Sequence, residues 1–366
     1  MKRVAASLLL LALPVAFVLM PATAQDGKKT VIGKIIRLDP RFDKLVPKDA
    51  QLEKITGGYI WTEGTVWVKN GGYLLFSDIP NNVVIKWKEG EGASKFVFPS
   101  GYTGKKPRGG KPGDEPGSNG LTIDPEGRLT LCEHGDRRVA RIDVKLGPDP
   151  KPMLDAKSMK KTTLAYTTDG KRLNRPNDQV WHSNGDLYFT DPPYGLEKWY
   201  DDPARELDYC GVYLLKKDGS LKLLTKEMSR PNGIALSPDE KTLYVANSDF
   251  AKPVWMSFPV KTDGTIGDGK VFYDSSDFVK AKRKGLPDGM KVDVHGNLWA
   301  TGPGGLHVFA PDGTLLGTLD TGVNTANCCF GDEPSLRLRH HGNRRATVDL
   351  QPHIVQAGCP EPKLRA

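Results

Sequence analysis

Short apolar strands recur along the chain in pairs, and a tight turn joins the two strands of each pair. The second strands read, for example, YLLFSD (73–78), DLYFTD (186–191) and TLYVAN (242–247). The turns before them, such as KNGG (69–72) and HSNG (182–185), carry the Gly and Asn residues that hairpins favour. Helical periodicity is scarce, and 40 glycines with 28 prolines suit many turns better than helices. The pattern predicts an all-β chain.

The strand pairs form a repeat. A polar residue starts the first strand of each unit, and these start residues follow one another at intervals of 55 to 58 residues: Glu63, Asn119, Asn177, Asn232 and Asp288. A third and a fourth strand follow in most units, as in residues 211–224. The intervals between strands lack the amphipathic stretches of a βαβ fold, and a sandwich would not repeat so regularly. We therefore predict a six-bladed β-propeller.

The N-terminal end of the chain departs from this pattern. Residues 1–24 combine two basic residues, an apolar run and a small Ala-Thr-Ala site, which together predict a signal peptide cleaved after Ala24. We expect a periplasmic or secreted protein with no stable membrane insertion after cleavage. The propeller should then span residues 25–331, with VIGKIIRL (31–38) as the outer strand of the last blade.

The C-terminal end departs from it as well. A sixth unit begins near TANCCFG (325–331), but no alternating second strand follows it. Residues 332–366 are rich in Arg and His, and we predict a divergent, disordered basic tail. The last blade is therefore expected to be incomplete.

Charge and cysteine content exclude several classes of protein. The net charge is +8, but basic and acidic residues are interspersed and no basic stripe carries aromatic residues, which argues against a nucleic-acid partner. The five cysteines form no C-x-x-C pair: Cys132, Cys210, Cys328, Cys329 and Cys359. No zinc framework is therefore expected. Buried free thiols are the favoured interpretation, with a single disulfide as the alternative.

Propeller topology brings the start residues together. The first strand of a blade lines the central channel, so all five start residues lie around one mouth of that channel. The ends of the second strands lie on the same rim: Asp78, Glu133, Asp191 and Asn247. His182 and His295 stand in turns on the opposite face. Each start Asn taken alone is also explained by a local turn, but carboxylate and amide oxygens gathered in one place suit Ca²⁺, or else Mg²⁺ or Mn²⁺.

The same motifs resemble a known family. WTEGTVW (61–67), SNGLTIDPEGRLTLCEHGDRRVARID (118–143), RPNDQVW (175–181), RPNGIALSPDEKTLYVANS (230–248) and LPDGM (286–290) are similar to the gluconolactonase/regucalcin (senescence marker protein) family, in its secreted bacterial type. The resemblance covers about residues 31–331. It implies a six-bladed propeller with one divalent metal in the channel and hydrolysis of sugar lactones.

The resemblance also implies roles for single residues. It makes Glu63, Asn232 and Asp288 metal ligands, and it makes Asn177 either a ligand or a substrate contact beside Arg175. Two features depart from the family pattern. Thr65 stands where the first motif usually has proline, and the C-terminus lacks further strands.

A lactone is a cyclic ester, so its hydrolysis needs a polarised carbonyl and an activated water. A Ca²⁺ ion would serve as the Lewis acid, with Zn²⁺, Mn²⁺ and Mg²⁺ as alternatives. Asp288 is the predicted general base, and Glu133 and His134 are the alternatives. The predicted substrate contacts are Arg175, Asn177, Asn119 and Tyr194, with Tyr194 in a lid and Arg175 orienting hydroxyls or bracing the Asn177 turn.

Two other functions stay open at this stage. The first is a related hydrolase of esters or organophosphates that uses the same site. The second is a propeller that binds Ca²⁺ or a partner without catalysis. A serine hydrolase is not indicated, because the chain has no Gly-x-Ser-x-Gly elbow. The oligomeric state is left open.

Overall fold

A computed structural model describes residues 30–105, 109–110, 113–157 and 159–331. The predicted signal peptide and the predicted basic tail lie outside these residues, so both stay predictions. Among the described residues, no helix has the length and apolar character needed to cross a bilayer.

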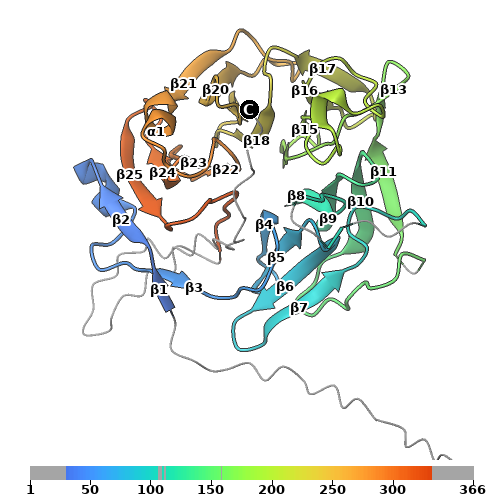
Figure 1. The fold of residues 1–366 in the computed structure, drawn as a ribbon, viewed down its shortest axis with the longest axis horizontal. Coiled ribbons are helices and arrows are strands. Elements are labelled where there is room, and N and C mark those ends of the chain that lie inside the picture. Colours follow the sequence, from blue (N-terminus) through green and yellow to red (C-terminus); the bar gives the residue numbers. More distant parts are fainter. Residues whose placement is uncertain (1–29, 106–108, 111–112, 158, 332–366) are drawn as a thin grey trace, which may run out of the picture.

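Five antiparallel sheets stand in a circle around a common centre (Figure 1), which confirms the all-β propeller. The first contains β4 (Thr62–Val68), β5 (Tyr73–Asp78), β6 (Val83–Lys88) and β7 (Gly92–Val97). The second contains β8 (Ser118–Ile123), β9 (Arg128–Glu133), β10 (Arg138–Lys145) and β11 (Lys161–Ala165). The third contains β14 (Gln179–Trp181), β15 (Leu187–Asp191), β16 (Gly211–Leu215) and β17 (Leu221–Thr225). The fourth contains β18 (Pro231–Leu236), β19 (Thr242–Asn247), β20 (Val254–Pro259) and β21 (Lys270–Asp274). The fifth contains β22 (Met290–Val292), β23 (Leu298–Gly302), β24 (Gly305–Phe309) and β25 (Leu315–Asp320).

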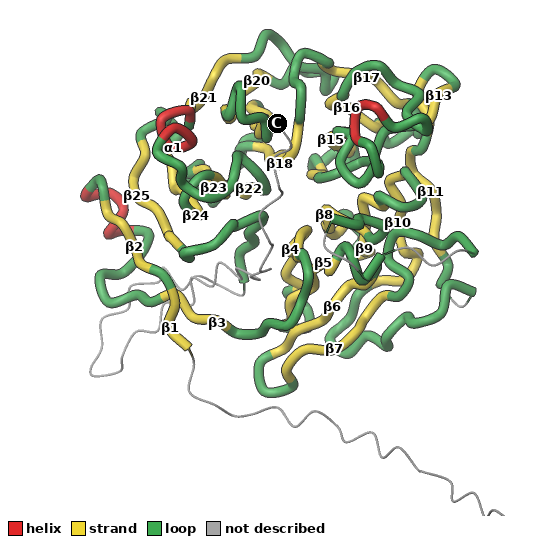
Figure 2. The backbone as a smooth tube through the Cα atoms, in the orientation of Figure 1, coloured by secondary structure: helices red, strands yellow, loops and turns green. Residues whose placement is uncertain are grey.

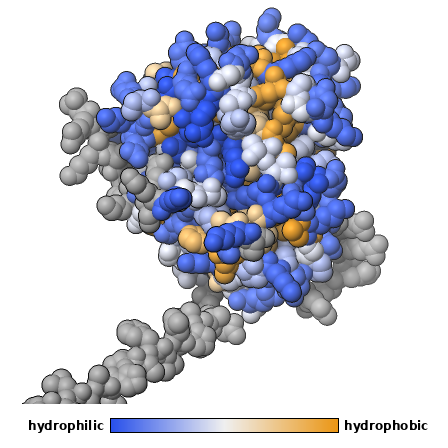
Figure 3. All heavy atoms as spheres, turned by 90° about the vertical axis from the view of Figure 1, so that its right-hand side faces the viewer, coloured by the Kyte–Doolittle hydropathy of each residue, from blue (hydrophilic) through white to orange (hydrophobic). Residues whose placement is uncertain are grey.

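The other described elements are short. They are β1 (Thr30–Ile32), β2 (Lys34–Arg37), β3 (Leu52–Lys54), β12 (Thr167–Thr168), β13 (Lys171–Arg172), the 3-10 helices η1 (Pro40–Lys44) and η2 (Trp199–Asp201), and the helix α1 (Ser276–Lys280). Figure 2 shows how little helix accompanies the strands. Polar residues cover most of the side seen in Figure 3, and apolar side chains form separate patches on it.

The prediction of six blades is not confirmed. Residues 325–330 reach the place where a sixth blade would begin, but they form no strand. The N-terminal strands lie between the fifth and the first blade (Figure 1), where β1 pairs only with β3. The predicted outer strand is present over Lys34–Arg37, but it pairs with β25 and so extends the fifth blade.

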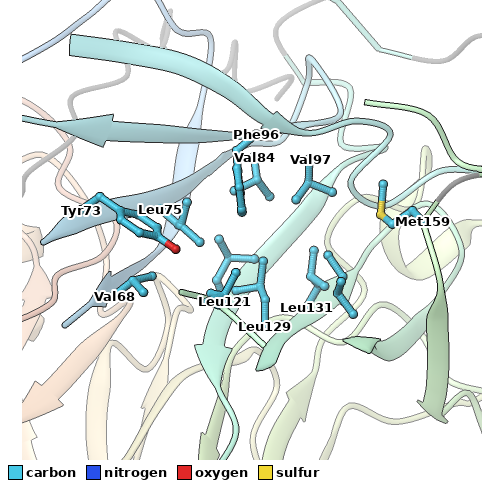
Figure 4. Close-up of a cluster of buried hydrophobic side chains, with 12 residues drawn as sticks. Val68, Tyr73, Leu75, Val84, Phe96, Val97, Leu121, Leu129, Leu131 and Met159 are labelled. Atoms are coloured by element: carbon cyan, nitrogen blue, oxygen red, sulfur yellow. The ribbon is translucent and has the colours of Figure 1, made fainter. Parts of the chain in front are cut away.

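Apolar residues pack between neighbouring blades. Side chains alternate along a strand, so Tyr188 and Phe189 of β15 enter different clusters on the two faces of their sheet. Figure 4 shows the cluster between the first two blades, to which both Leu75 of β5 and Leu131 of β9 belong. Cys132, Cys210, Cys328 and Cys329 are buried free thiols, as expected. The blades therefore stabilise one another through their faces.

His307 is a polar residue inside this packing. It is fully buried in β24, with Nδ1 3.0 Å from Thr318 Oγ1 and Nε2 3.2 Å from the Pro303 carbonyl. Burial lowers the pKa of His307 to about 4. An unfolded chain has a histidine pKa of about 6.5. Below pH 6.5, His307 is protonated in the unfolded chain but stays neutral in the folded protein until the pH nears 4. The free energy of unfolding therefore falls as the pH is lowered through this range.

We expect this histidine to account for part of the acid sensitivity of the protein. Between pH 7.5 and pH 5.0, His307 alone should lower the free energy of unfolding by about 2 kcal/mol. In His307→Gln this part of the pH dependence should disappear, and urea unfolding at the two pH values measures it. The exposed His295→Gln is the matched control and should keep the wild-type dependence. An unchanged pH dependence in His307→Gln would contradict the prediction.

Candidate active site

The first strand of a blade begins with a bulge at its start residue. The register shifts between Glu63 and Val66 in β4, and the corresponding shifts occur in β8 and β18. A glycine follows the start residue in four of the five blades, because the neighbouring blade passes directly against it. A Cβ on Gly64 would lie 2.0 Å from the Asn119 carbonyl oxygen, and one on Gly233 would lie 2.2 Å from that of Asp288.

These contacts link the start residues into a ring. Gly120 N donates to the Asn177 carbonyl at 2.7 Å, and Gly289 N donates to the Ala326 carbonyl at 2.8 Å. Gly289 packs against the Asn327 side chain, and Asn327 Nδ2 donates to Glu63 Oε2 at 3.3 Å. Four of the five predicted start residues are buried, and Asp288 is half-buried with its Oδ1 atom enclosed. Asn327 occupies the sixth place and closes the ring, although the residues around it form no strand. It was not predicted, because it follows Asp288 by 39 residues instead of about 56.

Three buried carboxylates lie close together in this ring. Burial raises the pKa of Glu63 to about 8, and the charge of Asp178 contributes. Burial also raises the pKa of Asp288 well above its usual range, and the charges of Glu63 and Asp178 add to the effect. The pKa of Asp178 is raised by burial too, although Lys291 opposes the shift. Like charges at this depth are costly unless a cation neutralises them.

Asp178 was also missed by the sequence analysis. It occupies the position that is glycine after the other four start residues, so RPND differs from RPNG and from PDGM at this one place. The signal that could have revealed Asp178 was an acid at a position where close packing requires glycine in the other blades. Its backbone and Oδ1 instead approach Gly120 of the preceding blade.

Second-strand ends brace their own blades instead of joining the ring. Asp78 Oδ1 accepts from the backbone N–H groups of Ile60 and Trp61, both at 3.3 Å. Asp191 Oδ2 accepts from the N–H of Asn174 at 2.7 Å. Asn247 Oδ1 accepts from the N–H of Arg230 at 2.9 Å. In each of these three blades, the bond holds the backbone just before the first strand. These bonds support the ring indirectly.

Glu133 differs from its predicted role. Its side chain crosses the blade away from the channel, where Oε1 lies 2.6 Å from Lys161 Nζ and Oε2 lies 2.6 Å from Arg138 Nε. Both oxygens thus bind cations of β10 and β11. Because both oxygens are engaged within their own blade, Glu133 does not reach the ring and does not fit the predicted role of base.

The other predicted residues form the wall above the ring. Arg175 is buried and its Nη1 donates to the backbone carbonyl of His134, so it braces a neighbouring loop. His134 is fully buried, and burial lowers its pKa. Tyr194 donates to the Ser248 carbonyl at 3.3 Å, and its ring contacts Trp199 edge to face. Burial raises the pKa of Tyr194 well above its usual range, and the charge of Asp288 contributes.

Residues 61–338 match the family described as the SMP-30/Gluconolactonase/LRE-like region. The chain belongs to this family. It is 39% identical to a gluconolactonase of Zymomonas mobilis over 316 residues, which are 85% of each chain. It is 27% identical to human regucalcin over 276 residues, which are 74% of this chain and 78% of that protein.

Solved structures of the SMP-30/gluconolactonase family share the fold. A gluconolactonase from Xanthomonas campestris superposes with a TM-score of 0.67 at 30% identity, over 84% of this chain and 91% of that one. A calcium-binding regucalcin from Agrobacterium tumefaciens gives a TM-score of 0.55 at 19% identity, over 76% and 80% of the two chains. The second likeness shows the fold alone.

The ring has the donor set that a hard divalent cation requires. Asp288 Oδ1 and Asn119 Oδ1 are buried and have no hydrogen-bond partner among the described residues. Buried oxygens without a donor are costly in an empty site and become ligands when a cation is present. The described part of the chain holds no group of three His, Cys, Asp or Glu side chains arranged for metal binding. A cation would therefore need the Asn amide oxygens as well as the acids.

Proposed function

We propose that this protein is a metal-dependent lactonase that opens sugar lactones such as gluconolactone. The observation that carries the proposal is the buried ring of acids and amides with its unpartnered oxygens. The 39% identity to a gluconolactonase supports the same reaction class. A position in the periplasm or outside the cell, after removal of residues 1–24, belongs to this proposal.

The residues that would hold the cation are Glu63, Asn177, Asn232 and Asp288. A bound Ca²⁺ would polarise the lactone carbonyl as a Lewis acid; Zn²⁺, Mn²⁺ and Mg²⁺ are the alternatives. Asn327 would hold the Glu63 carboxylate in place through its hydrogen bond. Asp178 would add negative charge beside the ligands, which favours a divalent ion.

Asp288 is the proposed base. Its free Oδ1 can accept a proton from the attacking water, and burial makes the carboxylate a stronger base than an exposed aspartate. His134 is neutral and stays the alternative. Arg175, Asn177 and Asn119 would orient the hydroxyl groups of the sugar, and Tyr194 would cover it. The ring-opened product leaves as a hydroxy acid.

The test is gluconolactone hydrolysis by the purified protein, followed as acid release above the spontaneous rate. We expect activity to disappear on dialysis against a chelator and to return with Ca²⁺, more than with Zn²⁺, Mn²⁺ or Mg²⁺. Activity that resists the chelator would contradict the metal mechanism. A phosphotriester and a simple aryl ester serve as comparison substrates; faster turnover of either would favour the related hydrolase.

A further inference from the structure

Glu115 lies in the Gly- and Pro-rich loop between β7 and β8, which sequence analysis left without a function. Backbone hydrogen bonds fix the loop on both sides of it. Gly117 N donates to the Ile79 carbonyl at 3.0 Å, and Gly135 N donates to the Pro116 carbonyl at 3.1 Å. The side chain of Glu115 is 27% exposed. The carboxylate is therefore held in a defined place that solvent can reach.

A buried histidine orients this carboxylate. Glu115 Oε2 lies 3.0 Å from Nδ1 of the fully buried His134. No hydrogen bond of normal geometry joins the two groups, so this close contact holds Oε2 beside the imidazole through electrostatic attraction. No described residue donates to the other oxygen, Oε1. One oxygen lies against the imidazole, and the second can accept a hydrogen bond that no described residue supplies.

Glu115 lies beside the residues of the wall. Its charge is one cause of the raised pKa of Asp288, after burial and the charges of Glu63 and Asp178. Gly195, next to Tyr194, packs directly against the pair: a Cβ there would lie 2.9 Å from His134 Nδ1 and 3.2 Å from Glu115 Cβ. Arg175 binds the backbone carbonyl of the same histidine. An anchored acceptor thus lies in the wall that also contains Arg175 and Tyr194.

We propose that Glu115 determines specificity by accepting a hydrogen bond from a hydroxyl group of the substrate. This inference rests on the proposed lactonase function and deepens it. A sugar lactone offers hydroxyl donors, whereas an unsubstituted lactone offers none. A site built around a charged acceptor rejects the molecule that leaves the acceptor unpaired, because both the hydrogen bond and the hydration are then lost. The site therefore selects polyhydroxylated lactones.

The test compares glucono-δ-lactone with δ-valerolactone in Glu115→Gln. The ratio of the two kcat/KM values should fall about 10- to 100-fold in the variant, the range for a hydrogen bond to a charged group. Asp114→Asn, which removes the neighbouring charge, is the matched control and should keep the wild-type ratio. A ratio that stays unchanged in Glu115→Gln, or falls equally in Asp114→Asn, would overturn the assignment.

Binding of the inert glucono-δ-lactam separates this inference from the proposed function. Its affinity, measured by calorimetry, should fall by the same factor in Glu115→Gln whether or not the protein turns over lactones. Equal lactam affinity in both proteins, or no binding to the wild type, overturns the role of Glu115. If the wild type binds the lactam but hydrolyses no lactone, the lactonase proposal fails and Glu115 is judged by binding alone. Circular dichroism of the variant checks that it is folded.

Discussion

Asp288→Asn should reduce kcat for gluconolactone by about 10³-fold or more while the protein stays folded. The substitution keeps the size of the side chain and the backbone bond from Asp288 N to the Thr301 carbonyl, at 2.9 Å. It removes a buried carboxylate oxygen, Oδ1, that has no hydrogen-bond partner among the described residues. Loss of a general base alone costs about 10² to 10⁴ in rate, and a weakened metal site adds to the loss.

The measurement is kcat at saturating Ca²⁺, so that weaker metal binding is compensated as far as possible. Asp312→Asn is the control, because it also removes one carboxylate from the fifth blade. Asp312 lies in the exposed turn between β24 and β25, outside the ring. We expect the control to match the wild type. A loss below about tenfold in Asp288→Asn would exclude it as the base and would leave His134 as the candidate.

Local chemistry explains why most of the fold was predictable. A second strand such as β19 and its turn are specified by neighbouring residues, and the repeat multiplies that signal over five blades. The sixth blade was not predictable in this way. Whether residues 325–330 become a strand depends on a partner strand from another part of the chain, and β2 pairs with β25 instead. Ring closure is a long-range property.

The candidate site was predictable to the extent that it follows the repeat. Glu63, Asn177, Asn232 and Asp288 share one structural position, so periodicity found them together. Asn327 has a shortened spacing, and Glu115 lies in a loop that has no period. Both were recognised only through contacts, Asn327 with Glu63 and Glu115 with His134.

Glu133 was predicted to belong to the site, but its side chain lies elsewhere. Its position at the end of β9 was predicted correctly, but side-chain direction decides function there. Successive side chains of a strand point to the two faces of the sheet, not along the strand toward the mouth. Glu133 therefore reaches Arg138 and Lys161 across its own sheet. Glu63, Asn119 and Asn232 instead lie at bulges, where the regular alternation of side chains is interrupted.

Calcium should reverse the order of stability between the wild type and Glu63→Gln. Without a cation the folded protein must bury Glu63 beside Asp178 and Asp288, and the pKa of Glu63 is raised to about 8. A raised folded-state pKa means that stability is present at low pH and is lost as the pH rises toward about 8. A neutral glutamine removes this cost. In a chelator at pH 8, we expect Glu63→Gln to unfold with a free energy about 1 to 3 kcal/mol above that of the wild type.

Addition of Ca²⁺ should act in the other direction. At a concentration 100 times the dissociation constant, a bound ion adds about 2.7 kcal/mol to the free energy of unfolding of the wild type. Glu63→Gln lacks one charged ligand and should gain little. Urea unfolding in chelator and in Ca²⁺ measures both proteins, with the exposed Glu227→Gln as the control that should follow the wild type. If the rank order of the two proteins is the same with and without Ca²⁺, Glu63 is not a ligand. The order can reverse because the Glu63 carboxylate lowers the free energy of unfolding when the ring is empty and raises it when the ring holds Ca²⁺.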